Sequence, residues 1–136
     1  MDWITRTQDS IGLLILRLTV GAMFAFHGYE KLFGDLTRLT EGIRGMGFPF
    51  PEQQAYLVAG SEFFGGLLLI FGLFTRMASI PLLVIMLVAI WKVHGPKGFS
   101  LQGGGFEYNL VISGALFALL CLGSGKFSLD RKISQS

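Results

Sequence analysis

The chain has 136 residues, of which 51% are hydrophobic and only 15% are charged. An ordinary soluble domain carries about 25% charged residues, so a small chain of this composition could not cover itself with polar side chains in water. The net charge of +2 is too small to favour nucleic acid as a partner. The single cysteine, Cys121, excludes an intrachain disulfide, a CxxC pair and a cysteine zinc site.

Four apolar stretches, taken in chain order, predict membrane-spanning helices. A helix needs about 17–25 apolar residues to cross a hydrocarbon core about 30 Å thick. The first two stretches meet this length, the third is at its limit, and the fourth is short unless its flanking residues are included. A buried soluble helix is the alternative for any one stretch, but four stretches with little polar sequence between them favour the membrane. The predicted spans are residues 11–29, 55–74, 77–93 and 107–123.

The segment between the first two spans predicts a short amphipathic helix lying in the membrane interface. Its apolar residues fall at i, i+4, i+7 and i+11, and charged residues occupy the other face. Gly45 and Gly47 end this pattern, and Pro49 and Pro51 favour an extended entry to the second span. The apolar residues are Leu32, Leu36, Leu39 and Ile43, and the charged ones are Asp35, Arg38, Glu41 and Arg44.

The predicted fold is therefore one all-α membrane domain over residues 1–136, a four-transmembrane-helix bundle with a short interfacial helix between its first two spans. Four spans place both termini on the same side of the membrane. The Lys and Arg counts of the two sides are equal, so the positive-inside rule does not decide the orientation. Net charge leans towards cytoplasmic termini, and that orientation is the expectation.

Polar residues within the apolar stretches point to a functional site, because a charge inside a membrane span is costly and marks a candidate site. Arg17 lies about two turns into the first span, and Glu62 lies about two turns into the second. His27 and Lys31 lie at the end of the first span, and Glu107 lies at the start of the fourth. Because alternate helices run in opposite directions, all of these residues except Arg17 belong to the same half of the bundle.

Helical spacing predicts that these residues line an interior pocket near one membrane face. At about 100° per residue, Arg17 and Lys31 share one stripe of the first helix, and His27 lies at its edge. A vertical gap of about 10 Å makes a direct Arg17–Glu62 pair less favourable than a pair of Glu62 with His27 or Lys31. The expected polar cluster consists of Arg17, His27, Lys31, Glu62 and Glu107, with His94 as a further candidate.

Other interpretations of these residues stay open at this point. Arg17 and Glu62 could be structural charges that neutralise each other, and the two histidines could be interfacial side chains without a ligand. No HxxxH or ExxH spacing on one helix supports a metal site, so no metal is expected.

The order of several short motifs resembles the DoxX family over nearly the whole chain. The resemblance implies a four-helix bacterial inner-membrane protein, and its polar positions match Arg17, His27, Lys31, Glu62 and Glu107. The family is named for relatives of a small subunit of thiosulfate:quinone oxidoreductase, and other relatives assist redox-enzyme maturation or oxidative-stress defence. The motifs are Leu16-Arg17-Leu18, His27-Gly28-Tyr29-Glu30-Lys31-Leu32, Gly47-Phe48-Pro49, Glu62-Phe63-Phe64-Gly65-Gly66, Gly72-Leu73-Phe74-Thr75-Arg76, Phe106-Glu107-Tyr108-Asn109 and Gly123-Ser124-Gly125-Lys126-Phe127-Ser128-Leu129-Asp130.

Two function classes follow from these observations. The first is a quinone-linked redox subunit, in which His27 or Lys31 donates to a quinone carbonyl and Glu62 or Glu107 relays protons. No flavin or Fe–S motif and no covalent cofactor is expected, so this role needs a membrane or redox protein as partner. The second class is a non-catalytic scaffold subunit of a larger membrane complex, whose charges only fix helix packing. A homo-oligomer is a further expected arrangement, and the lipid bilayer is the surrounding medium in both cases.

Overall fold

The computed structural model describes residues 9–136, and every regular element in that part of the chain is a helix. The all-α prediction is confirmed, and the helix expected between the first two spans is present as α3. A π-helical turn at Ile90–His94 continues α5, and short 3-10 turns cover Gly95–Lys97 and Leu101–Gly103. The α-helices are α2 (Asp9–Phe33), α3 (Thr37–Gly45), α4 (Pro51–Phe71), α5 (Thr75–Ala89), α6 (Glu107–Leu122) and α7 (Leu129–Gln135).

Three of these helical segments are long and apolar enough to cross a membrane. They are Ser10–Phe33, Pro51–Phe71 and Thr75–Lys97. The fourth expected span corresponds to α6, which is apolar but has only 16 residues. At 1.5 Å per residue such a helix is about 24 Å long, less than a hydrocarbon core about 30 Å thick.

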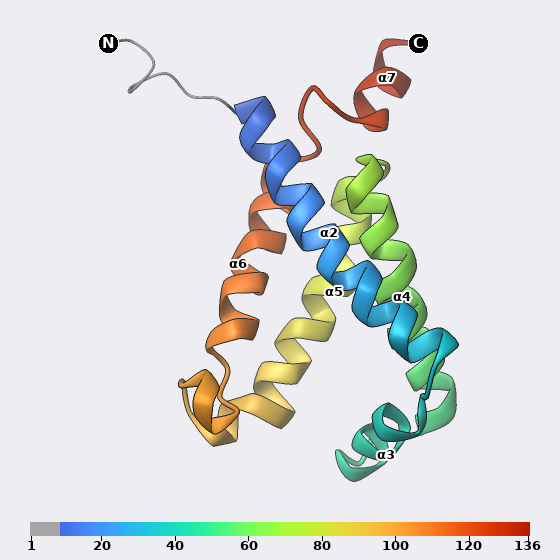
Figure 1. The fold of residues 1–136 in the computed structure, drawn as a ribbon, viewed down its shortest axis with the longest axis vertical. Helices are drawn as coiled ribbons and strands as arrows, with labels where there is room; N and C mark the ends of the chain where they lie inside the picture. Colours follow the sequence, from blue (N-terminus) through green and yellow to red (C-terminus); the bar gives the residue numbers. More distant parts are fainter. Residues whose placement is uncertain (1–8) are drawn as a thin grey trace.

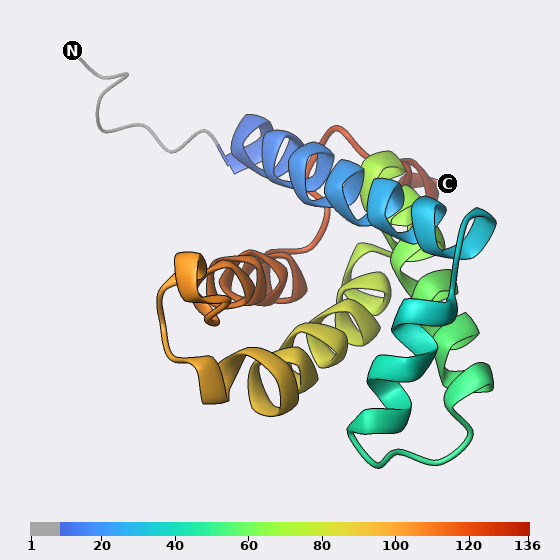
Figure 2. The same ribbon diagram turned by 60° about the horizontal axis from the view of Figure 1, so that its bottom comes forward.

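The helices run alternately up and down, so the start of α2 lies at the same end of the molecule as α7 (Figure 1). The loop between α5 and α6 and the short helix α3 lie at the opposite end. Seen from that end, α3 lies beside α4 (Figure 2), in agreement with the contacts between these two helices. Two ends of the bundle therefore differ, one carrying α7 and the other carrying α3.

The closest helix pair is α2 with α4, and glycine makes this approach possible. A Cβ at Gly28 would overlap the backbone of Glu62 and Phe63, and a Cβ at Gly66 would overlap the backbone of Ala25. Small residues at such crossings let the backbones of membrane helices touch. The crossing fixes the position of Glu62 relative to α2.

The core lies between the long helices near the middle of the bundle. Its fully buried members include Leu69 of α4, Leu82 of α5, and Leu116 and Leu119 of α6. The outer faces carry exposed large apolar residues, such as Val111 and Met77, on every long helix. Apolar side chains that face outwards all around the bundle are what a protein surrounded by lipid requires.

Candidate functional site

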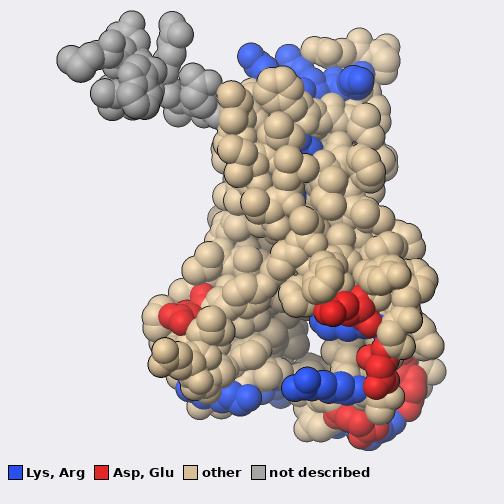
Figure 3. Space-filling view, in the orientation of Figure 1, with Lys and Arg blue, Asp and Glu red and all other residues tan. Residues whose placement is uncertain are grey.

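A cavity of about 730 Å³ opens at the α3 end of the bundle, between α3, α4 and α5. This volume lies within the range of about 300–1,000 Å³ typical of small-molecule sites. Most of its wall is apolar, and the polar groups are few. Figure 3 shows a hollow at this end, with acidic and basic side chains close to it. The polar residues of the wall are Lys31, Gln54, Ser61, Glu62, His94 and Asn109.

An ion pair forms the charged part of this wall. Lys31 Nζ of α2 lies 2.8 Å from Glu62 Oε2 of α4. The Glu62 side chain is only 5% exposed, whereas that of Lys31 is 34% exposed. Glu62 lies near the middle of α4, where an unpaired carboxylate would be costly, so Lys31 provides the compensating charge. Removal of Lys31 would therefore leave a buried charge without a partner.

The end of α5 forms a further part of the cavity wall. There the α-helix continues into the wider π-helical turn. This turn places Val93 and His94 on the cavity wall. His94 Nδ1 lies 2.7 Å from the carbonyl oxygen of Gly104, in the loop before α6. Lys92 Nζ lies 4.1 Å from the centroid of the Trp91 ring and 5.8 Å from that of Phe48, another lining residue. Such π-turns are frequent at functional sites, and this one links the α5 end to the loop before α4.

His27 is not among the residues that line the cavity, although the sequence placed it in the predicted pocket. Its ring is half exposed, and its closest charged neighbour is Glu30, at 3.9 Å on the same helix. The backbone of Gly28 faces α4, and His27 precedes it by one residue, or about 100° around the helix. This rotation turns the imidazole away from the cavity.

Glu107 also lies outside the cavity wall. Its Oε1 atom accepts a hydrogen bond of 2.8 Å from the backbone N–H of Leu101. Because Glu107 is the first residue of α6, its carboxylate ties the preceding loop to the start of this helix. Asn109, two residues further on, takes the position in the cavity that Glu107 was expected to occupy.

Arg17 lies at the other end of the bundle and is 1% exposed. Its guanidinium donates to the carbonyl oxygens of Leu69, at 3.5 Å, and Phe127. Neutralisation of Arg17 by Glu62 is therefore not found: α2 and α4 are antiparallel, so Arg17 meets the end of α4 and Lys31 meets Glu62. Gly72, with φ +66°, follows α4 and leaves room for this guanidinium, which a Cβ there would overlap.

Two groups of functional interest were not predicted from the sequence. Asn109, Gln54 and Ser61 are polar cavity residues, and only Asn109, in the first turn of an apolar helix, offered a sequence signal. The second group lies around Asp130 in the C-terminal tail, residues 123–136, which follows α6. The Asp130 carboxylate accepts hydrogen bonds from the backbone N–H groups of Phe74 and Thr75. Nothing in the apolar pattern indicates that the tail folds back onto the start of α5.

Exposed ion pairs hold α3 against the start of α4, beside the cavity. Arg44 of α3 pairs with Glu41 of the same helix, and its Nη2 atom lies 2.6 Å from Glu52 Oε1 of α4. The hydrogen bond with Glu41 raises the pKa of the Arg44 guanidinium above its usual value. Residues of α2 to α6 and of the loop after α3 thus line a lipophilic cavity, with the Lys31–Glu62 ion pair in its wall.

The long apolar helices and the outward-facing apolar side chains define an all-α integral membrane protein. The chain belongs to the DoxX family, whose model matches residues 12–95. Among its relatives, an uncharacterised Haemophilus influenzae protein is 31% identical and covers 93% of this chain and 86% of its own length. The Bacillus subtilis protein "Putative oxidoreductase CatD" is 32% identical, with 88% of this chain and 85% of that protein covered. The Escherichia coli inner membrane protein YqjF is 28% identical, over 93% of this chain and 95% of its own. No solved structure matches the chain significantly.

Proposed function

We propose that this protein is a quinone-associated subunit of a membrane redox system and acts with a partner protein. The observation that carries the proposal is the cavity of about 730 Å³ with the Lys31–Glu62 pair in its wall. The relative with the name "Putative oxidoreductase CatD" supports the redox class. We also propose that α6 completes a four-span domain over residues 1–136 in the bacterial inner membrane, with cytoplasmic termini; the naming of a relative as an inner membrane protein supports the location.

The donor set of the cavity fits a quinone headgroup. A quinone presents two carbonyl oxygens on an apolar ring, so its site needs apolar walls and a few well-placed donors. Lys31 Nζ and the amide groups of Gln54 and Asn109 are such donors on separate elements. The remaining wall, which includes Ile85 and Val58, offers apolar contact for the ring and its tail.

A bound quinone would supply the capacity to carry two electrons and two protons. The residues of this chain hold and move protons: Lys31 donates a hydrogen bond, and Glu62 accepts or releases a proton beside it. Side chains of this kind supply no electrons, so a redox protein that docks on the bundle must deliver or remove them. The chain's own contribution is binding, orientation and proton transfer.

Quinone content is expected to follow the ion pair. Glu62→Gln and Lys31→Gln should each lower the quinone retained per protein by about tenfold or more, since hydrogen bonds to charged groups contribute roughly 1.5–3 kcal/mol. The measurement is mass spectrometry of quinones and co-purifying proteins after gentle extraction from native membranes.

His27→Gln and Glu107→Gln serve as matched controls, because both residues lie outside the cavity wall. They should retain quinone at the level of the unaltered protein. A stable partner complex that holds no quinone and is unchanged by Glu62→Gln would remove the redox proposal and leave a scaffold subunit.

A further inference from the structure

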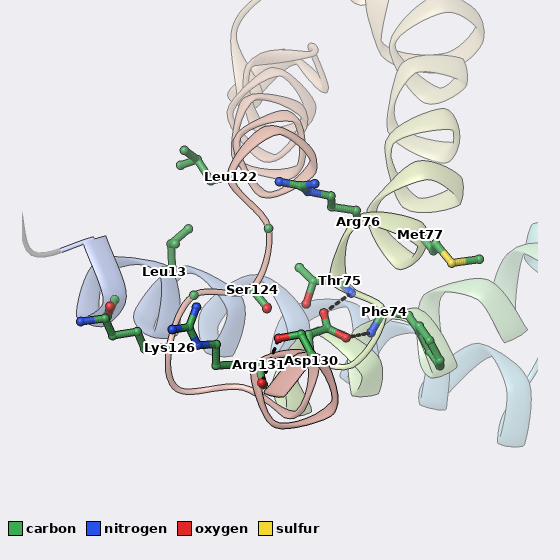
Figure 4. A pocket seen from close by; sticks show the side chains of 14 residues that line it. Leu13, Phe74, Thr75, Arg76, Met77, Leu122, Ser124, Lys126, Asp130 and Arg131 are labelled. Carbon is green, nitrogen blue, oxygen red and sulfur yellow. Dashed lines mark hydrogen bonds between the residues drawn. The ribbon is translucent and has the colours of Figure 1, made fainter. Parts of the chain in front are cut away.

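A second pocket, of about 470 Å³, lies at the opposite end of the bundle, between the starts of α2 and α5, the end of α6 and the tail. Three cations of the described part of the chain line it: Arg76 of α5, Lys126 before α7, and Arg131 of α7. Figure 4 shows Arg76 on one side of this pocket and Lys126 and Arg131 on the other. Within residues 10–136, none of the three lies within 4.0 Å of a carboxylate. The pocket therefore concentrates positive charge.

Among the described residues that line the pocket, Asp130 is the one acidic residue, and its carboxylate already accepts hydrogen bonds. Oδ1 accepts a hydrogen bond of 2.7 Å from the backbone N–H of Phe74, and Oδ2 accepts one of 3.1 Å from that of Thr75. These bonds, dashed in Figure 4, bind the carboxylate to the start of α5. Asp130 thus shapes the pocket without pairing with its cations.

A buried hydroxyl at the pocket has no hydrogen-bond partner among the described residues. Thr75 is 0% exposed, lines the pocket, and its Oγ1 atom has no hydrogen-bond partner within the described residues. Buried polar atoms nearly always have a partner, so this hydroxyl is available to a group that enters the pocket. Arg76 also has donors to spare: within the described residues it donates from Nη2 alone, to the carbonyl oxygen of Cys121 at 3.1 Å.

The rim of the pocket indicates where the ligand comes from. Met77 and Leu122 line the pocket and are 68% and 64% exposed, on the outer faces of apolar helices. Thr75 begins one candidate span, and Leu122 ends α6, so the pocket lies at the level where the apolar helices meet water. An anion that enters here has hydrocarbon on one side and cations on the other.

We propose that this pocket binds the phosphate headgroup of an anionic phospholipid. The phosphate oxygens accept hydrogen bonds from Arg76, Arg131 and the Thr75 hydroxyl, while Lys126 adds charge. The acyl chains run along Met77 and Leu122. This site is separate from the quinone cavity and does not depend on it.

The experiment is native mass spectrometry of the full-length protein in detergent, with short-chain phosphatidylglycerol, short-chain phosphatidylcholine or inorganic phosphate added. Phosphatidylglycerol is expected to bind at least about fivefold more tightly than phosphatidylcholine. Loss of one cation should weaken the binding of phosphatidylglycerol about fivefold. The variants are Arg76→Gln, Arg131→Gln and Thr75→Val. Thr75→Val should weaken the binding of phosphatidylglycerol by roughly two- to tenfold. Arg38→Gln is the matched control, because it removes the same charge from an exposed position on α3 at the other end.

Circular dichroism verifies that each variant is folded. If Arg76→Gln does not fold, Arg131→Gln still tests the proposal, because the Arg131 side chain makes no hydrogen bond or ion pair within the described residues. Equal binding of both lipids would overturn the proposal. An Arg131→Gln variant that binds phosphatidylglycerol as the Arg38→Gln control does would also overturn it. Inorganic phosphate that binds as tightly as phosphatidylglycerol would show a free-anion site instead of a lipid site.

Discussion

Replacement of Gly28 by alanine is expected to lower the stability of the bundle by about 1–3 kcal/mol, the usual cost of overpacking, or by more if the backbones cannot separate. The added methyl group would overlap backbone atoms of Glu62 and Phe63, which cannot rotate away as a side chain can. To relieve the overlap, α2 and α4 must move apart where Lys31 meets Glu62. The measurement is thermal unfolding in detergent, followed by circular dichroism.

Gly12 provides the control on the same helix. A Cβ at Gly12 meets nothing within 4 Å, so Gly12→Ala adds a methyl group in open space. Alanine is favoured over glycine inside a helix by roughly 0.5–1 kcal/mol, and this variant should be as stable as the unaltered protein or more stable. If Gly28→Ala and Gly12→Ala unfold at the same temperature, the α2–α4 crossing is looser than the structure indicates.

Removal of Lys31 alone is expected to destabilise the protein more than removal of both members of the ion pair. Breaking a fully buried pair costs about 3–5 kcal/mol, and a smaller loss of about 1–3 kcal/mol is expected because Lys31 is partly exposed. In Lys31→Met the Glu62 carboxylate, 5% exposed, has lost its counter-charge. Adding Glu62→Gln removes that charge and should restore most of the loss.

A double-mutant cycle with Lys31→Met, Glu62→Gln and the combined variant measures this coupling. A coupling energy of about 1–3 kcal/mol is expected for residues in direct contact. Coupling near zero would mean that Lys31 and Glu62 contribute independently, and the cavity would then lack the organised pair on which quinone binding depends.

Sequence patterns predicted the helices and the Lys31–Glu62 ion pair, but they did not predict how the ends of the helices are closed. Spacing of about 100° per residue placed Lys31 on the stripe that faces α4, where it meets Glu62. The same spacing left His27 at the edge, and the close contact at Gly28 decides that it turns outwards. That contact depends on the packing of two helices, which a single-chain pattern does not contain.

Glu107 and Arg17 lie away from the cavity for a different reason, since both satisfy backbone groups at an end of a helix. Glu107 bonds to the loop before α6, and Arg17 bonds to the tail after it. Polar side chains near helix ends compete for such unpaired backbone groups, so their charge alone does not indicate a ligand site. The π-helical turn that carries His94 also has no signature in the apolar pattern.

Photo-labelling with an azido-quinone tests the central claim most directly. The full-length protein in its native membrane is labelled, digested and mapped by mass spectrometry. We expect cross-links on the cavity walls of α4 and α5, around Val58 and Ile85, that unmodified quinone competes away and that fall about tenfold in Lys31→Gln. Labels spread over the outer, lipid-facing residues such as Val111 and Phe64, unchanged by competition or by Lys31→Gln, would contradict a quinone site in this cavity.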